Sequence, residues 1–127
     1  MNNIITTIDN KIAVITLNRP ERMNAITIDL LEELKNELIS LNNNKSISVI
    51  ILTGAGKAFT AGIDLRQIEE NGTDISSGGV GKTLDKLANT VINLIEESPK
   101  AVISKINGFC FTGGLELALS ADLIYVA

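Results

Sequence analysis

The stretch NGFCFTGGLELALSADLIYVA, residues 107–127, decides how the rest of the chain is interpreted. It begins with a glycine-rich turn over residues 108–114, continues as a short apolar helix over residues 115–120 and ends as a strand over residues 122–127. The turn delivers one carboxylate, that of Glu116, onto the first turn of the helix. Any hypothesis about function therefore begins with that side chain.

Upstream of this stretch, strands and helices alternate in the same way. Residues 4–8 and 11–17 predict a hairpin, because the turn-forming pair Asp9-Asn10 separates them. Residues 47–53 (ISVIILT) are apolar nearly throughout, as a strand buried on both faces is, and residues 101–106 predict another strand. The alternation indicates an α/β fold in one domain, since 127 residues are too few for two.

Two amphipathic helices are expected between the strands. Thr27 can cap the first, and the second ends at Ser98-Pro99. The apolar stripe of the first consists of Ile28, Leu31, Leu34, Leu38 and Leu41. The stripe of the second consists of Leu84, Leu87, Ala88, Val91, Leu94 and Ile95. Residues 57–70 begin with small side chains and continue as a short helical pattern. Residues 71–81 (NGTDISSGGVG) are expected to form a mobile surface loop.

The composition excludes several classes of protein. The sequence contains no histidine, which excludes Ser-His-Asp and Cys-His catalysis and the common zinc sites, so no metal is expected. A net charge of −4 and the absence of Trp argue against a nucleic-acid surface. The single cysteine, Cys110, fits a reducing compartment. We see no signal peptide and no stretch apolar enough to cross a bilayer, so a cytoplasmic protein without membrane contact is expected.

Two motifs with charged residues have competing interpretations. SGGVGKT, residues 77–83, looks like a phosphate-cradling loop, with Lys82 as the phosphate lysine and Thr83 as the Mg²⁺ ligand. Ser76 stands where that motif needs its first glycine, and no hydrophobic strand precedes it, so a loop leading into a helix is the simpler interpretation. Glu116, taken alone, also fits an ordinary surface residue that the helix dipole stabilises.

Three blocks of sequence, in order, resemble the crotonase superfamily of enoyl-CoA hydratases and isomerases. They are AVITLNRPERMNAI (residues 13–26), VIILTGAGKAFTAGIDL (49–65) and SPKAVISKINGFCFTGGLELALSADLIYVA (98–127). The resemblance implies the crotonase (ClpP/crotonase-like) fold, a spiral of β-β-α units. Residues 1–127 would be the N-terminal part of a single domain of this fold, truncated before the C-terminal helices.

The resemblance also implies a reaction, the hydration of an enoyl-CoA. The carbonyl oxygen of an acyl-CoA thioester would accept hydrogen bonds from the backbone N–H groups of Ile63 and Gly113, and Glu116 would act as general acid or base at the acyl carbons. Negative charge accumulates on the thioester oxygen when water adds to the conjugated double bond, and fixed amides stabilise that charge. A backbone donor requires no particular side chain, which is why Ile63 can serve, but it requires small neighbours such as Gly62.

In the family, a further set of positions lines the groove for coenzyme A. By motif position these are Arg22, Met23, Ala25, Ala61, Asp64 and Leu65. Arg22 is the cation expected to meet a phosphate, with an ordinary loop arginine as the alternative. Met23 and Ala25 could equally be packing residues, and Asp64 could cap a helix. Coenzyme A would be part of the substrate, so no separate cofactor is implied. Thr112 stands where the family has a glycine.

Some features of the family would lie beyond Ala127. These include the second glutamate of the hydratases and the helices that help to assemble trimers and hexamers, so the chain is expected to be a fragment of a homo-oligomeric enzyme that cannot hydrate substrate by itself. The last strand would form an exposed sheet edge. Three alternatives remain open: a double-bond isomerase, a non-catalytic acyl-CoA-binding or interaction module, and a nucleotide binder.

Overall fold

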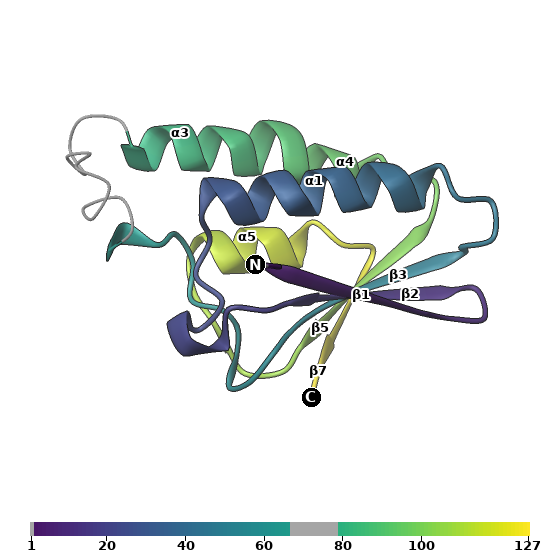
Figure 1. The fold of residues 1–127 in the computed structure, drawn as a ribbon, viewed down its shortest axis with the longest axis horizontal. Coiled ribbons are helices and arrows are strands. Elements are labelled where there is room, and N and C mark those ends of the chain that lie inside the picture. The colour runs from purple at the N-terminus through teal and green to yellow at the C-terminus, as the bar shows by residue number, and fades with distance from the viewer. Residues whose placement is uncertain (1, 67–78) are drawn as a thin grey trace.

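The computed structural model describes residues 2–66 and 79–127, and Figure 1 shows their arrangement. The strands are β1 (Ile4–Asp9), β2 (Ile12–Leu17), β3 (Val49–Gly54), β4 (Ala58–Thr60), β5 (Ala101–Ile106), β6 (Phe109–Cys110) and β7 (Leu123–Val126). The helical elements are η1 (Pro20–Arg22), α1 (Ile28–Asn42), α3 (Gly79–Lys86), η3 (Leu87–Ile92), α4 (Asn93–Glu96) and α5 (Gly113–Leu119). Pairs of strands are each followed by helix, as the expected β-β-α units require.

Two sheets position the segments that follow them. The larger sheet has the order β1-β2-β3-β5-β7, with β1 and β2 antiparallel, which confirms the hairpin, and the other pairs parallel. The smaller sheet pairs β4 with β6 in parallel, and the backbone N–H of Phe111 donates to the carbonyl of Thr60 at 3.2 Å. Residues 109–110 were predicted as part of a turn. That prediction is wrong, because only pairing with a distant segment makes so short a strand.

The helix α1 packs its leucine stripe on the larger sheet. As predicted, Thr27 caps it, and its Oγ1 accepts a hydrogen bond from the backbone N–H of Leu30 at 3.1 Å. The predicted stripe is correct except at its start. Leu30 is fully buried and Ile28 is 44% exposed, because the capped first turn directs Ile28 away from the sheet.

The second predicted helix is the continuous run of α3, η3 and α4. It begins at Gly79 and not at Leu84, because the glycines that suggested a loop are helical here. The stretch η3 is a π-helix, a wider turn with i→i+5 hydrogen bonds. The buried residues of the run are spaced four apart, at Thr83, Leu87, Val91 and Ile95, whereas Leu84 is 39% exposed.

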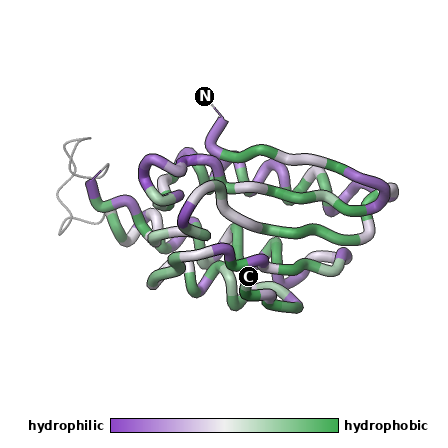
Figure 2. Tube along the Cα trace, turned by 90° about the horizontal axis from the view of Figure 1, so that it is seen from below, coloured by the Kyte–Doolittle hydropathy of each residue, from purple (hydrophilic) through white to green (hydrophobic). Residues whose placement is uncertain are grey.

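The helices cover one face of the larger sheet, as Figure 1 shows. The strand predicted for residues 47–53 was expected to be buried on both faces. This prediction is wrong for the described residues. Ile50 and Leu52 of β3 are buried beneath the helices, but Ile51 lines an apolar hollow of about 390 Å³ on the other face. Figure 2, seen from below, shows hydrophobic colouring along these strands. The two edge strands of this sheet, in the described residues, are β1 and β7, and all four residues of β7 are exposed.

Part of the sequence-based interpretation falls on residues that the structure does not describe. The helical pattern of residues 57–70 is seen only at Leu65 and Arg66, which are helical. Of the predicted mobile loop, residues 71–78 lie outside the described residues, and residues 79–81 belong to α3.

Candidate functional site

The loop between β2 and α1 folds around one buried amide side chain. Asn24 is fully buried and left-handed (φ 55°), a conformation that Asn tolerates better than most residues. Its Oδ1 accepts from the backbone N–H of Arg19 at 2.8 Å, and its Nδ2 donates to the carbonyls of Ala55 and Ala58, each at 2.9 Å. The loop is therefore fixed to the turn that follows β3.

A second set of bonds joins this loop to the segment after β4. The backbone N–H of Ile26 donates to the carbonyl of Gly62 at 2.7 Å, and the N–H of Asp64 donates to the carbonyl of Ile26 at 2.8 Å. Ile63 lies between these two bonded groups and faces Ile26 across a parallel bridge. In such a bridge the N–H of Ile63 points away from the partner strand, and within the described residues it has no acceptor.

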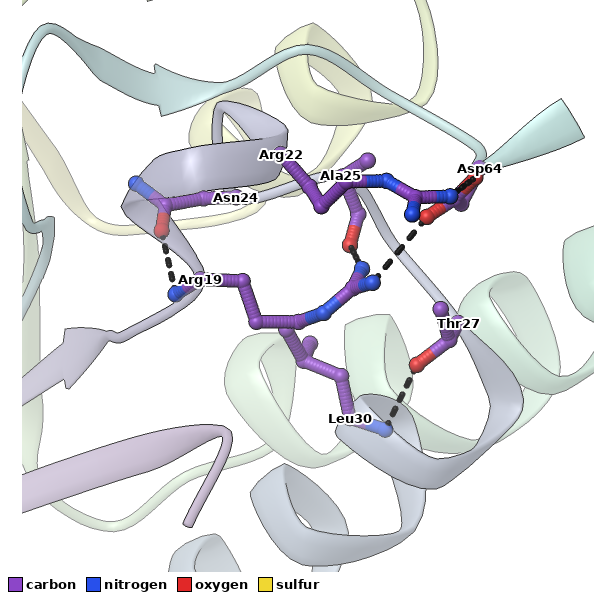
Figure 3. Close-up of polar contacts among 7 residues, drawn as sticks. All are labelled: Arg19, Arg22, Asn24, Ala25, Thr27, Leu30 and Asp64. Carbon is purple, nitrogen blue, oxygen red and sulfur yellow. Dashed lines mark hydrogen bonds and ion pairs between the residues drawn. The ribbon is translucent and has the colours of Figure 1, made fainter. Parts of the chain in front are cut away.

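Beside Ile63, Asp64 is buried between two arginines, as Figure 3 shows. Its Oδ2 lies 3.1 Å from Nη2 of Arg19, and its Oδ1 lies 3.3 Å from Nη2 of Arg22. The Asp64 side chain is only 3% exposed, against 11% for Arg19 and 25% for Arg22. Asp64 was expected to line the coenzyme A groove. That prediction is untested, but its carboxylate already joins the two loops.

The second predicted donor, Gly113, is the first residue of α5. The bonds of this turn run from the N–H of Gly114 to the carbonyl of Phe111 (2.8 Å) and from the N–H of Glu116 to the carbonyl of Thr112 (3.1 Å). The N–H of Gly113 has no acceptor in the part of the chain that the structure describes. Because α5 has only seven residues, the expected help from a helix dipole is small, and the unbonded amide is the stronger feature.

Glycines allow the two amide-bearing segments to touch. Gly62 has φ 91°, and a Cβ there would stand 2.6 Å from Oγ1 of Thr112 and 3.7 Å from the backbone nitrogen of Gly113. From the other side, a Cβ on Gly113 would stand 3.7 Å from Cδ1 of Ile63. The peptide that carries the Ile63 amide therefore lies beside the Gly113 amide, although Ile63 and Gly113 are far apart in sequence.

Thr112 takes an unusual conformation between these groups. Its φ of 40° and ψ of −110° are strained for a β-branched residue, and its side chain makes no capping hydrogen bond to α5. The family glycine that it replaces would accept this conformation without strain. Oγ1 of Thr112 packs directly on Gly62 and leaves no room for a side chain at that position.

Glu116 lies on the exposed face of α5, one turn after Thr112. Its side chain is exposed to solvent, as that of an ordinary surface residue is. The apolar side chains of Leu115 and Leu119 on the same face are also exposed, at 45% and 60%, and Phe111, just before the helix, is 52% exposed. The carboxylate therefore stands on an open apolar surface, on the same short helix as the Gly113 amide.

The remaining positions implied for the coenzyme A groove lie around the two joined loops. Ala25 is buried, Met23 and Ala61 are half-buried, and Leu65 is 47% exposed. The backbone N–H of Ala61 donates to the carbonyl of Met23 at 3.0 Å, so these two are direct neighbours. Arg22 lines a groove of about 980 Å³ whose wall also includes Asn18, Arg19, Pro20, Glu21, Thr27 and Asp29.

Other groups considered from the sequence offer less. Thr83, the possible Mg²⁺ ligand of a nucleotide site, is only 2% exposed inside α3, which argues against that role, while residues 77–78 of the motif are not described. Burial raises the pKa of the Cys110 thiol, which disfavours the reactive thiolate. The described residues hold no cluster of three acidic or thiol ligands that could bind a metal. None of their helices is long and apolar enough to cross a membrane.

Sequence reasoning missed Arg19 and Asn24, the two residues that organise the first loop. A signal was present, because an asparagine shortly after Pro20 in a polar loop is a candidate for a left-handed turn. The partner of Arg19 could not be read from sequence, since Asp64 lies 45 residues away.

Comparisons with known proteins identify relatives of this chain. The sequence model of the family described as enoyl-CoA hydratase/isomerase matches residues 7–127. Over 124 residues the chain is 37% identical to the short-chain-enoyl-CoA hydratase of Clostridium acetobutylicum, covering 97% of this chain and 46% of that protein. It is also 37% identical to the peroxisomal Δ(3,5)-Δ(2,4)-dienoyl-CoA isomerase of Arabidopsis thaliana, covering 92% and 45%.

Among solved structures, an enoyl-CoA hydratase from Bacillus anthracis superposes with a TM-score of 0.89 at 35% identity, covering 98% of this chain and 47% of that one. The fold is therefore the crotonase fold, as the resemblance implied. The chain spans about half the length of the curated relatives that it matches.

Proposed function

The chain belongs to the enoyl-CoA hydratase/isomerase family, and we propose that its protein adds water reversibly to a 2-enoyl-CoA. One observation supports the proposal: the segments that carry the N–H groups of Ile63 and Gly113 are in contact, and neither N–H has an acceptor among the described residues. Unbonded amides cost free energy unless water or a ligand satisfies them. A thioester oxygen placed between them would supply that acceptor.

The proposed chemistry uses these amides where charge develops. A general base takes one proton from water as the oxygen of water bonds to C3 of the enoyl group, and the electrons of the double bond move onto the thioester oxygen as an enolate. C2 then takes a proton, and the carbonyl forms again. Ile63 and Gly113 would stabilise the enolate oxygen, and removing one such donor typically costs about 10²–10³ in rate. Glu116 would transfer the proton as general acid or base.

Substrate binding would use the two joined loops. Arg22 borders the groove and would meet a phosphate of coenzyme A, with Met23, Ala25, Ala61 and Leu65 along the path of the thiol arm. No cofactor is proposed besides the coenzyme A of the substrate. We also propose that the protein is a cytoplasmic homo-oligomer, a trimer or hexamer. Residues 1–127 would form the N-terminal part of its single crotonase-fold domain. Sedimentation of the natural gene product would test the oligomer.

The test of hydration is turnover of crotonyl-CoA by the protein at its natural length. Substituting Glu116→Gln removes the proton donor and should lower kcat by about 10²–10⁴-fold. Glu97→Gln, at the end of α4, is the matched control and should leave kcat unchanged. A protein that neither binds acyl-CoA nor loses activity in the Glu116 variant would refute the proposal.

A double-bond isomerase is the second candidate, and the dienoyl-CoA isomerase relative favours it. One carboxylate can move a proton between two carbons, and Glu116, which lies on the same short helix as the Gly113 amide, would do so. Incubation with a 3-enoyl-CoA in deuterium oxide separates the two reactions. Deuterium incorporation with a shifted double bond and no 3-hydroxyacyl product would establish the isomerase.

A further inference from the structure

We propose that Arg19 and Asp64 are positioning residues that aim the N–H of Ile63 at the thioester oxygen. The inference rests on the proposed function, because it assigns a purpose to the buried ion pair beside the candidate amide. It also changes the expected task of Asp64 from lining the coenzyme A groove to holding the segment that carries Ile63.

The direction of the Ile63 N–H depends on the residues on either side of it. On one side, the carbonyl of Gly62 accepts from Ile26. On the other, the backbone N–H of Asp64 donates to the carbonyl of Ile26. The carboxylate of Asp64 accepts from Arg19 and from Arg22. With both neighbours fixed, the peptide plane between Gly62 and Ile63 has little freedom to rotate.

Arg19 closes this arrangement into a ring, and Figure 3 shows the bonds from its guanidinium to Ala25 and Asp64. Its guanidinium donates through Nη1 to the carbonyl of Ala25 and through Nη2 to Oδ2 of Asp64. Ala25 adjoins Ile26, whose carbonyl accepts from Asp64, so the ring returns to its starting point. The backbone of Arg19 is itself fixed by Asn24. The planar guanidinium can make both bonds at once, which a lysine ammonium cannot do in the same geometry.

Burial separates this pair from an ordinary surface ion pair. The Asp64 side chain is 3% exposed, so little of its carboxylate can reach a ligand. The surface pair of Lys35 and Glu32 on α1 is exposed by 26% and 44%. A buried ion pair often adds little net stability, but it can hold the chain in one conformation. The expected consequence is a change in kcat and not in the affinity for coenzyme A.

The experiment compares Asp64→Asn and Arg19→Lys with Lys35→Gln, which removes a surface pair on α1 and serves as the control. Crotonyl-CoA is the substrate and the natural gene product is the protein. A misplaced donor can cost about 10²-fold, so kcat should fall to that extent in Asp64→Asn, with KM little changed. Arg19→Lys keeps the charge and should lose less. Lys35→Gln should match the wild type.

A second measurement uses the protein without ligand. In a ¹⁵N–¹H spectrum, the Ile63 amide should shift and exchange with solvent faster in both site variants but not in Lys35→Gln. This arm decides the inference even if the wild type turns over no thioester, a result that would refute the proposed function alone. If Asp64→Asn does not fold, Arg19→Lys still provides both readouts.

Three results would overturn the inference. One is a folded site variant with unchanged kcat. Another is a rise in KM at constant kcat, which would return Asp64 and Arg19 to substrate binding. The third is an Ile63 amide whose shift and exchange are the same in both variants as in the wild type.

Discussion

The two segments that carry the candidate amides are held in different ways. The segment around Ile63 is fixed by polar bonds: backbone bonds to Ile26 on both sides and a buried carboxylate between two arginines. The segment around Gly113 is fixed mainly by shape, because Gly114 packs against Thr60 and Oγ1 of Thr112 fills the space beside Gly62. The first should therefore be sensitive to loss of charge and the second to added volume.

The largest effect is expected from removing the charge at the centre of the first segment. Asp64→Ala leaves the guanidinium of Arg19 without its buried partner, and breaking such a pair typically costs about 3–5 kcal/mol of unfolding free energy. Urea unfolding measures the loss. Lys35→Gln, at an exposed pair, should cost no more than about 1 kcal/mol. Equal losses of unfolding free energy in Asp64→Ala and Lys35→Gln would show that the buried charge does not hold the first segment.

Added volume should damage the second segment. A Cβ on Gly114 would stand 2.5 Å from Cγ2 of Thr60 and 2.8 Å from its carbonyl oxygen, so Gly114→Ala should cost about 1–3 kcal/mol. Gly113→Ala is the matched control, since its Cβ would meet only side chains, at 3.4 Å or more. Thermal unfolding of both variants is the measurement. If Gly113→Ala is destabilised as much as Gly114→Ala, close packing at Gly114 does not hold this segment.

Strain at Thr112 predicts a gain in stability. A residue held in a sparsely populated region of φ and ψ costs about 1–3 kcal/mol, and glycine avoids most of that cost but loses some to chain entropy. Thr112→Gly should therefore raise the unfolding free energy by about 1 kcal/mol. Thr112→Ala keeps a residue with a Cβ at this positive φ, so it should not raise the unfolding free energy. If both variants are equally stable, the strain is absent.

The smallest effect concerns an exposed ion pair far from both segments. Hydrogen bonds from Lys35 and Lys86 lower the pKa of Glu32 from 4.5 to about 2. Because the folded pKa lies below the unfolded one, this contribution is complete above the unfolded value and is lost as the pH falls toward 2. The Tm of Glu32→Gln should lie slightly below that of the wild type at neutral pH and converge with it in acid. A Tm gap that persists in acid would show that ionisation is not its cause.

Much of the fold could be predicted from sequence, because local patterns determine it. The hairpin, the Thr27 cap and the alternation of strands and helices all follow from spacing and turn residues. The short strands β4 and β6 could not, since each exists only through the other. The start of α3 was missed because Gly79 and Gly81 suggest a loop, yet both residues are helical.

The candidate site was predicted less completely than the fold. Ile63, Gly113 and Glu116 came from family resemblance, and the structure adds that the segments around Ile63 and Gly113 are in contact. Sequence did not indicate how Ile63 is held. Arg19 looked like an ordinary loop residue until the partner supplied by the fold, Asp64, was known.

The most direct test of the paired amides is a ¹⁵N–¹H titration of the natural-length protein with acetoacetyl-CoA, whose enolate carries negative charge on its carbonyl oxygens. Hydrogen bonds to such an oxygen should move the amide proton resonances of Ile63 and Gly113 downfield together, while that of Lys35 stays in place. Binding of the thioester with neither resonance displaced would contradict the proposed oxyanion site.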